Sequence, residues 1–284
     1  MTDRRLGNGY LDGRVVVITG AGGGFGRLVA EMSAERGAHV VISDIDPGAA
    51  EDAAASIRSS GGEAEAIEVD VRDLAQMRSL AARTIDRFGA IDVMVNNAGI
   101  MPLAFLADHE QAAEAWDRCI DINFKGVLNG ICAVHDQMIN QGRGHIVNIS
   151  SIYGNTGTAG SGVYSATKAA VSILSDSLRK ESQGKIKVTT VRPTGVLGTG
   201  LSASVVNPAA TIGIVGPNSD AYIENVMSML SGTLEGPESD IDQTAYWAIT
   251  PESVAAEVVH VIDQPWGVTI SDITIRATGE QYVI

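Results

Sequence analysis

The chain is poor in cysteine and strongly acidic, and both features exclude classes of protein. Two cysteines among 284 residues cannot build a disulfide framework, and Cys119 and Cys132 have no partner at metal-ligand spacing. The formal net charge of −14 disfavours binding to nucleic acid or anionic membranes. Residues 4–10 carry two arginines but no apolar core of a signal peptide, and no apolar run reaches the length of a membrane span. We expect a reduced, cytoplasmic protein without a nucleic-acid or membrane partner.

Metal-ligand patterns are also missing. The histidines show no ligand-type pairing, and each is interpreted as structural or exposed: His39, His109, His135, His145 and His260. We expect no metal site.

The distribution of apolar residues favours an α/β fold. Hydrophobic residues make up 45% of the chain, and short β-branched runs alternate with longer amphipathic segments, which is typical of a parallel sheet covered on both faces. The pattern predicts one domain over residues 1–284 with a doubly wound sheet of about seven strands, at Arg14–Thr19, His39–Ser43, Ala64–Val69, Ile91–Asn96, His145–Ser150, Lys187–Arg192 and Val268–Ile275. Helices are expected between them, including Phe25–Arg36, Asp73–Phe88, Gln111–Asn140 and Val163–Glu181.

One segment interrupts this alternation. Between Pro193 and Thr250, glycine, proline and serine break the apolar pattern after the sixth predicted strand. Ligands of α/β folds bind beyond the carboxyl ends of the strands. The segment is therefore predicted to be a substrate-binding lid over about residues 194–250.

A glycine-rich segment follows the first predicted strand. The apolar run 15–18 leads into Thr19-Gly20-Ala21-Gly22-Gly23-Gly24-Phe25-Gly26, and an amphipathic helix is predicted next. Glycines allow the backbone to turn tightly and to approach a pyrophosphate, and the first N–H groups of the helix attract its negative charge. A lone glycine pattern is typical of many turns, but the strand before it and the helix after it predict a dinucleotide site.

Asp44 ends the second predicted strand, eighteen residues after Gly26. A carboxylate at that place can accept hydrogen bonds from the adenosine ribose and repels a 2′-phosphate, which favours NAD over NADP. The alternative is a solvated aspartate at a strand end, and the glycine segment makes the functional interpretation stronger. Arg27 is a cation that would offset the repulsion, but it lies inside the predicted helix.

Tyr164 and Lys168 are four residues apart on a predicted helix and therefore lie on one face of it. We expect the lysine ammonium to favour the phenolate and lower the tyrosine pKa. Ser151 directly follows the fifth predicted strand and offers a hydroxyl that polarises a carbonyl oxygen, with Ser150 as the competing candidate. A Tyr-x-x-x-Lys pair alone is usually a helix surface, so the interpretation depends on the serine and the glycine segment.

Together these residues resemble the short-chain dehydrogenase/reductase family over nearly the whole chain. The resemblance implies a three-layer Rossmann fold and a catalytic tetrad of Asn123, Ser151, Tyr164 and Lys168, in which Asn123 holds a relay water. Asn96-Asn97-Ala98-Gly99 resembles the family's strand-end motif that stabilises the sheet and borders the cofactor groove. The implied NAD-binding residues are Thr19, Gly20, Gly22, Gly24, Phe25, Gly26, Asp44, Ile45, Asp70, Val71, Asn97, Ala98, Gly99, Tyr164, Lys168, Pro193, Thr194 and Val196. The resemblance also implies a homotetramer built through helices 111–140 and 163–181.

The resemblance implies an NAD-dependent interconversion of a secondary alcohol and its ketone. Tyr164 would exchange the proton, Ser151 would bind the oxygen, and Lys168 would hold the nicotinamide ribose. The chain departs from the family's usual Pro-Gly after the sixth strand, because Thr194 follows Pro193. A β-branched residue there makes the local geometry of the lid less predictable.

The predicted pocket segments contain no cation. No lysine or arginine occurs at 193–275, 101–117 or 152–163. Burying an anion without a positive partner is costly, so we expect a small, neutral and hydrophobic substrate. Apolar surface is offered by Met101, Leu103, Phe105, Ile152, Met227, Met229 and Leu230. A phosphopantetheine thioester is a poor candidate for the substrate of this cation-free pocket.

Other functions stay open at this point. Residues 273–276 resemble a subgroup that includes reductases of small hydroxy acids, and a 3-oxoacyl reductase is a further alternative within the family. A non-catalytic NAD sensor is possible on the same fold, although the complete tetrad argues against it. Ser165-Ala166-Thr167-Lys168 matches the Ser-x-x-Lys pattern of penicillin-binding enzymes, but their other motifs are missing.

Overall fold

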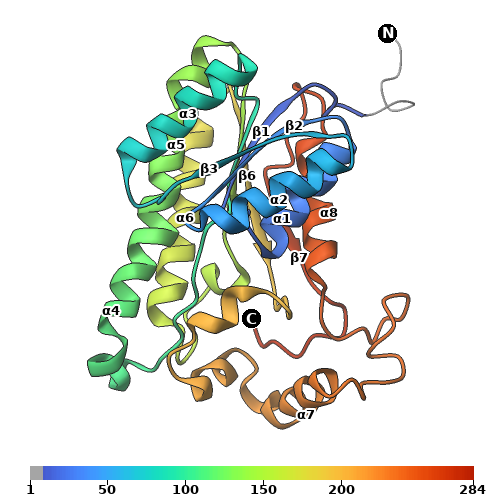
Figure 1. Ribbon diagram of the computed structural model, residues 1–284. Coiled ribbons are helices and arrows are strands. Elements are labelled where there is room, and N and C mark those ends of the chain that lie inside the picture. The colour runs from blue at the N-terminus through green and yellow to red at the C-terminus, as the bar shows by residue number, and fades with distance from the viewer. Residues whose placement is uncertain (1–8) are drawn as a thin grey trace.

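A seven-stranded parallel sheet runs through the centre of the computed structural model, which describes residues 9–284 (Figure 1). The strand order is β3-β2-β1-β4-β5-β6-β7, and every neighbouring pair is parallel. The strands are β1 (Val15–Thr19), β2 (His39–Asp44), β3 (Glu63–Glu68), β4 (Val93–Asn96), β5 (His145–Ile149), β6 (Lys187–Pro193) and β7 (Asp272–Ile275). The predicted doubly wound sheet is confirmed. Residues 4–8 of the segment searched for a signal peptide lie outside the described residues.

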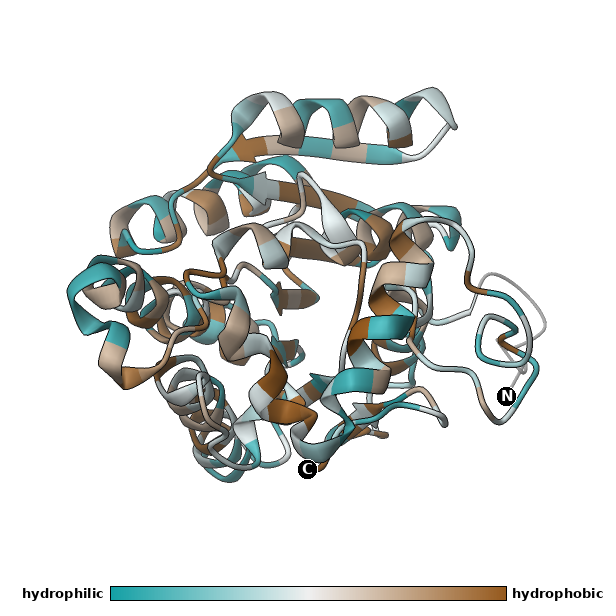
Figure 2. Cartoon of the chain, turned by 90° about the horizontal axis from the view of Figure 1, so that it is seen from below, coloured by the Kyte–Doolittle hydropathy of each residue, from teal (hydrophilic) through white to brown (hydrophobic). Residues whose placement is uncertain are grey.

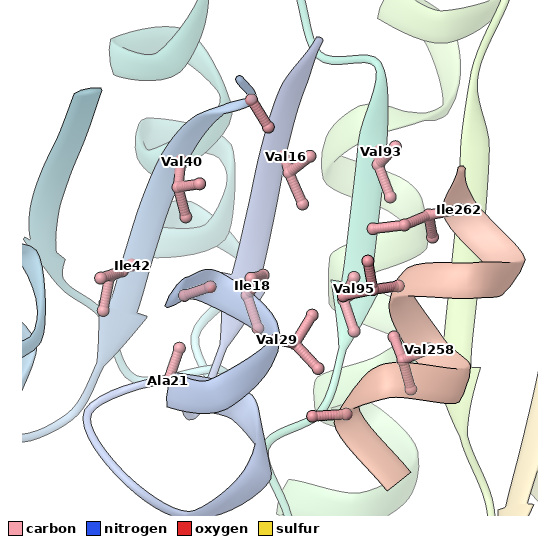
Figure 3. Packing of buried hydrophobic residues seen from close by; sticks show 14 of the residues in the cluster. Val16, Ile18, Ala21, Val29, Val40, Ile42, Val93, Val95, Val258 and Ile262 are labelled. Carbon is pink, nitrogen blue, oxygen red and sulfur yellow. The ribbon is translucent and has the colours of Figure 1, made fainter. Parts of the chain in front are cut away.

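One face of the sheet packs against α1 (Gly24–Glu35), α2 (Pro47–Ser59) and α8 (Pro251–Ile262). Alternate strand residues point to this face, as Val16 and Ile18 of β1 do in Figure 3. They meet Val29 of α1 and Val258 and Ile262 of α8, all at most 1% exposed. This side of the core accounts for the alternate apolar residues Val16 and Ile18 of β1.

The opposite face packs against α3 (Leu74–Phe88), α5 (Gly126–Asn140) and α6 (Gly162–Glu181). The intervening strand residues Val17, Val41 and Met94 point there and are at most 1% exposed. Both faces of the sheet are therefore buried, which a parallel sheet requires. Figure 2, seen from below, shows the strands enclosed between helices on both sides.

Three segments differ from the sequence prediction. The helix expected at 111–140 is divided into α4 (His109–Ile120), a π-helical segment η3 (Asp121–Lys125) and α5. The last strand begins at Asp272 instead of Val268, because the Val268 amide donates to the Pro265 carbonyl in a turn. The region 193–250 contains a helix, α7 (Ser219–Leu230), and the short 3₁₀ helices η5 (Gly200–Ser204), η6 (Pro208–Ile214) and η7 (Gly216–Asn218). Two further 3₁₀ turns are η2 (Leu106–Asp108) and η4 (Ile152–Gly154).

The strand order reverses between β1 and β4, because β2 and β3 lie on one side of β1 and β5–β7 lie beyond β4. The glycine segment follows β1, and Asn97-Ala98-Gly99 follows β4, so the two segments lie beside each other at the carboxyl edge. An open α/β sheet binds ligands at such a reversal point. In the part of the chain that the structure describes, no helix is long and apolar enough to cross a membrane.

Candidate active site

A cavity of about 350 Å³ lies over the reversal point of the sheet. The helix α1 starts at its edge, and the N-cap Gly23 has extended backbone and makes no side-chain cap hydrogen bond. The first N–H groups of α1 are thus not capped by a side chain. They lie at the positive end of the helix dipole, at the edge of the cavity. The lining residues include Gly20, Gly23, Gly24, Phe25, Gly26, Asp44, Ile45, Asp70, Val71, Arg72, Asn97, Ala98 and Gly99.

Two glycines are required by close packing of this loop. Gly20 has a φ of +62°, and a Cβ atom there would lie 2.8 Å from the Cα of Ala98. A Cβ on Gly26 would lie 2.7 Å from the Gly20 carbonyl oxygen and would also meet the side-chain amide of Asn97. The loop therefore closes against the end of β4 only with glycine at both positions.

Thr19 and Asn97 hold the loop in place. The Asn97 side-chain amide donates to the carbonyls of Thr19 and Gly20, at 2.9 Å each. In return, the Thr19 hydroxyl accepts from the backbone N–H groups of Asn97 (3.1 Å) and Ala98 (3.2 Å). Thr19 is 2% exposed and lies behind the loop, so the structure places it as a support rather than in the cavity wall.

Asp44 borders the cavity and also fixes the glycine loop. Its carboxylate accepts from the backbone N–H of Gly22 at 2.9 Å and from that of Asp46 at 3.1 Å. Gly22 is thus held from the side, and Asp44 retains acceptor capacity toward the cavity. A carboxylate at this place fits a ribose hydroxyl.

Arg72 is a cavity residue that the sequence interpretation missed. Its guanidinium forms a hydrogen-bonded ion pair with the Asp70 carboxylate, with Nε 2.9 Å from Oδ1 and Nη2 2.6 Å from Oδ2. This pairing holds the pKa of Asp70 below its ordinary value. A sequence signal existed, because Arg72 follows Asp70 by two residues at the strand end. The uncapped α1 start, the glycine packing and Asp44 fit a dinucleotide, and Arg72 adds a cation at the same cavity.

A second cavity of about 280 Å³ adjoins the first one, and Phe25, Asn97 and Gly99 line both. Ser151, Tyr164 and Lys168 line this second cavity, called the reaction cavity below. Pro193, Thr194 and Val196 form part of its wall, as does Gly195 between them. Three of the four predicted tetrad residues are thus brought together from η4 and α6.

Backbone contacts orient the three side chains. Lys168 Nζ donates to the Ile149 carbonyl at the end of β5, at 2.8 Å. Ser150 donates its hydroxyl to the Lys168 carbonyl (2.8 Å), so that hydroxyl is engaged by the α6 backbone. Ser151 is the N-cap of η4, where its hydroxyl accepts from the Tyr153 N–H (3.3 Å), and it lies beside Tyr164 in the cavity wall. Of the two candidate serines, Ser151 is the one beside the tyrosine.

Burial acts in opposite directions on the two titratable groups. It raises the pKa of Tyr164 above its ordinary value, and the Ser151 hydrogen bond offsets only part of that rise. It lowers the pKa of Lys168 to about 8. Lys168 Nζ lies 5.8 Å from the centroid of the Tyr164 ring. The prediction that Lys168 lowers the tyrosine pKa is wrong for this structure, because desolvation is the larger effect on a side chain that is 4% exposed.

Asn123 lies behind the reaction cavity rather than in its lining. It is fully buried in the π-helical segment η3, where its Oδ1 accepts from the Ile100 N–H (2.9 Å) and its Nδ2 donates to the Ile100 carbonyl (2.8 Å). A Cβ on Gly99 would lie 3.3 Å from Asn123 Oδ1 and 3.6 Å from Lys168 Nζ, so Gly99 separates the two side chains. π-Helical turns are often found at functional sites.

The apolar pocket residues were predicted only in part. Met101 and Leu103 line the reaction cavity, whereas Met227 and Leu230 are 60% and 73% exposed. The remaining three lie elsewhere: Phe105 and Ile152 belong to apolar clusters beside the cavity, and Met229 lines a neighbouring crevice. The missed residues include Tyr153, Val205, Ile214, Tyr222, Val226 and Tyr282. No periodicity signals them, because they come from turns, the helix α7 and the C-terminal segment.

The amino-acid chain matches the family model described as short chain dehydrogenase over residues 14–209. The chain belongs to the short-chain dehydrogenase family. An uncharacterized oxidoreductase of Listeria monocytogenes is 32% identical over 272 residues, which cover 95% of this chain and 98% of the relative. The 2,5-dichloro-2,5-cyclohexadiene-1,4-diol dehydrogenase of Sphingobium indicum is 37% identical over 197 residues, covering 69% of this chain and 77% of the relative.

Two solved structures of this short-chain dehydrogenase family are similar to the chain. A short-chain dehydrogenase/reductase from Burkholderia phymatum in complex with NAD has a TM-score of 0.73 and 28% identity, and covers 93% of this chain and 89% of its own. A metagenomic short-chain oxidoreductase in complex with NADP has a TM-score of 0.71 and 27% identity, with coverages of 95% and 99%. The chain is therefore a short-chain oxidoreductase of the type that uses NAD or NADP.

Proposed function

We propose that the chain is an NAD-dependent oxidoreductase that interconverts a neutral, hydrophobic secondary alcohol and its ketone. The observation that carries this proposal is the reaction cavity, where Ser151 and Tyr164 meet beside the dinucleotide cavity. Among its lining residues within the described chain, Lys168 is the one charged side chain, and its Nζ is held by the Ile149 carbonyl. An anionic substrate would have no free cation to pair with.

The side chains provide for proton transfer to the substrate oxygen. In ketone reduction, the Ser151 hydroxyl donates to the carbonyl oxygen, and Tyr164, whose raised pKa keeps it protonated, gives up its phenolic proton. In alcohol oxidation, Tyr164 accepts the proton and must first have lost its own. The rate of oxidation is therefore expected to increase with pH. A bound nicotinamide dinucleotide supplies or accepts the hydride. Lys168 would hold the nicotinamide ribose, and Asn123 would hold a relay water.

The proposal of NAD depends on Asp44. Its carboxylate borders the dinucleotide cavity and repels a 2′-phosphate. Arg72 favours NADP by its charge, but the Asp70 carboxylate already neutralises that charge by accepting hydrogen bonds from the guanidinium. We therefore expect Asp44→Ser to raise kcat/KM for NADP relative to NAD by about 10-fold, which corresponds to about 1.4 kcal/mol. An unchanged ratio would contradict the role of Asp44.

A neutral cyclic alcohol is the substrate class that we favour. The relative from Sphingobium indicum bears the name of a cyclohexadienediol dehydrogenase, and such a diol is neutral and cyclic. Met101, Leu103 and Val226 give the reaction cavity apolar walls of the kind that a hydrocarbon ring contacts. Small hydroxy acids and acyl thioesters remain the alternatives within the family.

The deciding experiment follows absorbance at the reduced-nicotinamide band. Purified protein is mixed with NAD or NADP and with neutral cyclic secondary alcohols or anionic hydroxy acids. Turnover of neutral alcohols with NAD is the expected result. Preference for hydroxy acids would contradict the inference from the cation-poor cavity, and dinucleotide binding without turnover of any alcohol would favour a sensor.

Two further parts of the proposal concern the whole protein. We propose a homotetramer formed through the α4–α5 and α6 faces, on the family resemblance. We also propose a cytoplasmic location, to which two unpaired cysteines, Cys119 and Cys132, are suited.

A further inference from the structure

The wall of the reaction cavity contains a group of tyrosines beyond Tyr164. Tyr153 packs edge-on against Tyr164, with ring centroids 5.5 Å apart and an interplanar angle of 76°. The ring centroids of Tyr222, in α7, and Tyr282 are 6.0 Å apart, and both residues line the cavity. The mechanism uses only Tyr164, so the other phenols are polar groups of the wall without an assigned role.

Tyr282 reaches the cavity because the C-terminal segment is fixed against the lid. The Val283 N–H donates to the Ile214 carbonyl at 3.0 Å, and the Trp247 indole donates to the side chain of Gln281 at 3.1 Å. Asn218 donates to the Gln281 carbonyl at 2.8 Å. Figure 1 shows the C-terminal end beside the segment that carries α7. The segment on both sides of Tyr282 is thus held, and its ring position is defined.

The hydroxyl of Tyr282 lies against the backbone of Gly195. A Cβ atom at Gly195 would collide with that hydroxyl, so only glycine admits the tyrosine at this place. Gly195 stands between Thr194 and Val196, in the wall that borders Ser151 and Tyr164. Tyr282 is therefore an integral part of the reaction cavity.

The phenols of Tyr222 and Tyr282 lie close enough to interact, with ring centroids 6.0 Å apart, and both line the reaction cavity. Each phenol has one O–H donor, so a mutual bond uses one donor and leaves the other. Within the described residues, neither hydroxyl has another hydrogen-bond partner in the protein. The pair thus retains at least one donor and free acceptor capacity in the wall of the reaction cavity.

We propose that Tyr222 and Tyr282 bind a second oxygen of the substrate, so that the preferred substrate is a cyclic alcohol or ketone bearing another hydroxyl or oxo group. This inference rests on the proposed function, and it specifies the substrate class. The reacting oxygen lies at Ser151 and Tyr164, while the second oxygen meets the tyrosine pair. Tyr153 packs against the apolar cluster that contains Tyr164 and against the cluster beside Tyr222 and Tyr282. A substrate with one oxygen leaves the pair without a partner, which costs binding energy.

The test compares alcohols that differ only in the second hydroxyl. Cyclohexanol is paired with cyclohexane-1,4-diol, and 1-tetralol with tetralin-1,4-diol, each with NAD and with NADP. The wild-type protein is expected to show a kcat/KM at least 10-fold higher for the diols. Tyr282→Phe and Tyr222→Phe, which keep the rings, are expected to lower the diol-to-monool ratio about 10-fold.

Tyr246→Phe is the matched control, because Tyr246 belongs to the lid but lines a different crevice. It is expected to keep the wild-type ratio. Circular dichroism checks that each variant is folded, and if Tyr282→Phe fails to fold, Tyr222→Phe decides the question.

Two outcomes would overturn the inference in distinguishable ways. If the alcohols are turned over and both tyrosine variants keep the wild-type ratio within 2-fold, or the wild type does not prefer the diols, the inference is wrong and the proposed function stands. If the wild type turns over none of the alcohols with either dinucleotide, the proposed function fails and the inference fails with it.

Discussion

The catalytic chemistry proposed for this chain depends on a few side chains placed where water is scarce. Tyr164 and Lys168 are 4% and 5% exposed. This burial keeps the Tyr164 phenol protonated and raises the free energy of the charged Lys168 ammonium. The same desolvation that suits Tyr164 as a proton donor thus destabilises the fold through Lys168. Function and stability are opposed at this residue pair.

Tyr164→Phe is expected to reduce turnover by about 10²–10⁴-fold, because the variant lacks the proton that the reaction exchanges. Dinucleotide affinity, measured by calorimetry, should change by less than about 5-fold, since a single neutral hydrogen bond typically contributes about 1 kcal/mol. Tyr153→Phe removes the hydroxyl of the neighbouring ring and should retain more than about a tenth of the rate. Equal losses in the two variants would contradict the role of Tyr164.

Lys168→Met is expected to abolish turnover and yet stabilise the fold at neutral pH. The pKa of Lys168 is about 8 in the folded protein and 10.5 in a free lysine, so the folded state releases its proton more readily than the unfolded state. The cost of the buried ammonium is about 3 kcal/mol at pH 7 and declines as pH rises from 8 to 10.5.

The free energy of unfolding, measured in urea, tests this. The advantage of Lys168→Met over the wild type should shrink by about 2 kcal/mol between pH 7 and pH 9.5. Lys185→Met, at an exposed surface position, serves as the control and should show little dependence on pH in this range. A pH-independent difference for Lys168→Met would refute the assigned shift.

At the scale of elements, the site is built where helix and strand ends meet. The start of α1 depends on the loop before it, and the loop depends on Asn97 at the end of β4. Gly26 is closely packed, whereas a Cβ at Gly23 would meet nothing within 4 Å. Neighbouring glycines in one motif thus carry different structural requirements.

Gly26→Ala is therefore expected to lower the free energy of unfolding by about 1–3 kcal/mol, because the added methyl group displaces Asn97 or the Gly20 carbonyl. Gly23→Ala should change it by less than about 0.5 kcal/mol, since its backbone is extended and its Cβ position is open. Thermal and urea unfolding measure both. A larger loss for Gly23→Ala than for Gly26→Ala would show that the loop packs differently.

At the scale of the molecule, the proposed tetramer concerns the outer faces of two helices. Ile173 of α6 is 68% exposed and Ile120 of α4 is 42% exposed, on the helices proposed to form the tetramer interface. Large apolar side chains exposed on such faces are typical of surfaces that become buried in an oligomer.

Light scattering is expected to give the mass of four chains, about 118 kDa from a chain mass of 29.6 kDa. Ile173→Glu should convert the tetramer to smaller species, because a carboxylate would be buried at the interface. Ile223→Glu, on the lid helix α7 with a side chain that is 49% exposed, should leave the tetramer intact. A wild-type mass near that of one chain would refute the assembly.

The sequence alone determined the sheet, the dinucleotide loop and the cluster of Ser151, Tyr164 and Lys168, because local patterns encode them. Apolar periodicity reports which strand face is buried, and short fixed spacings such as 164 to 168 place side chains on one helix face. Only the tertiary structure decided the direction of the Tyr164 pKa shift, the position of Arg72 and the entry of Tyr222 and Tyr282 into the reaction cavity. Desolvation and long-range contacts, such as that of Tyr282 with Gly195, depend on packing between segments distant in the sequence and leave no periodic signal in it.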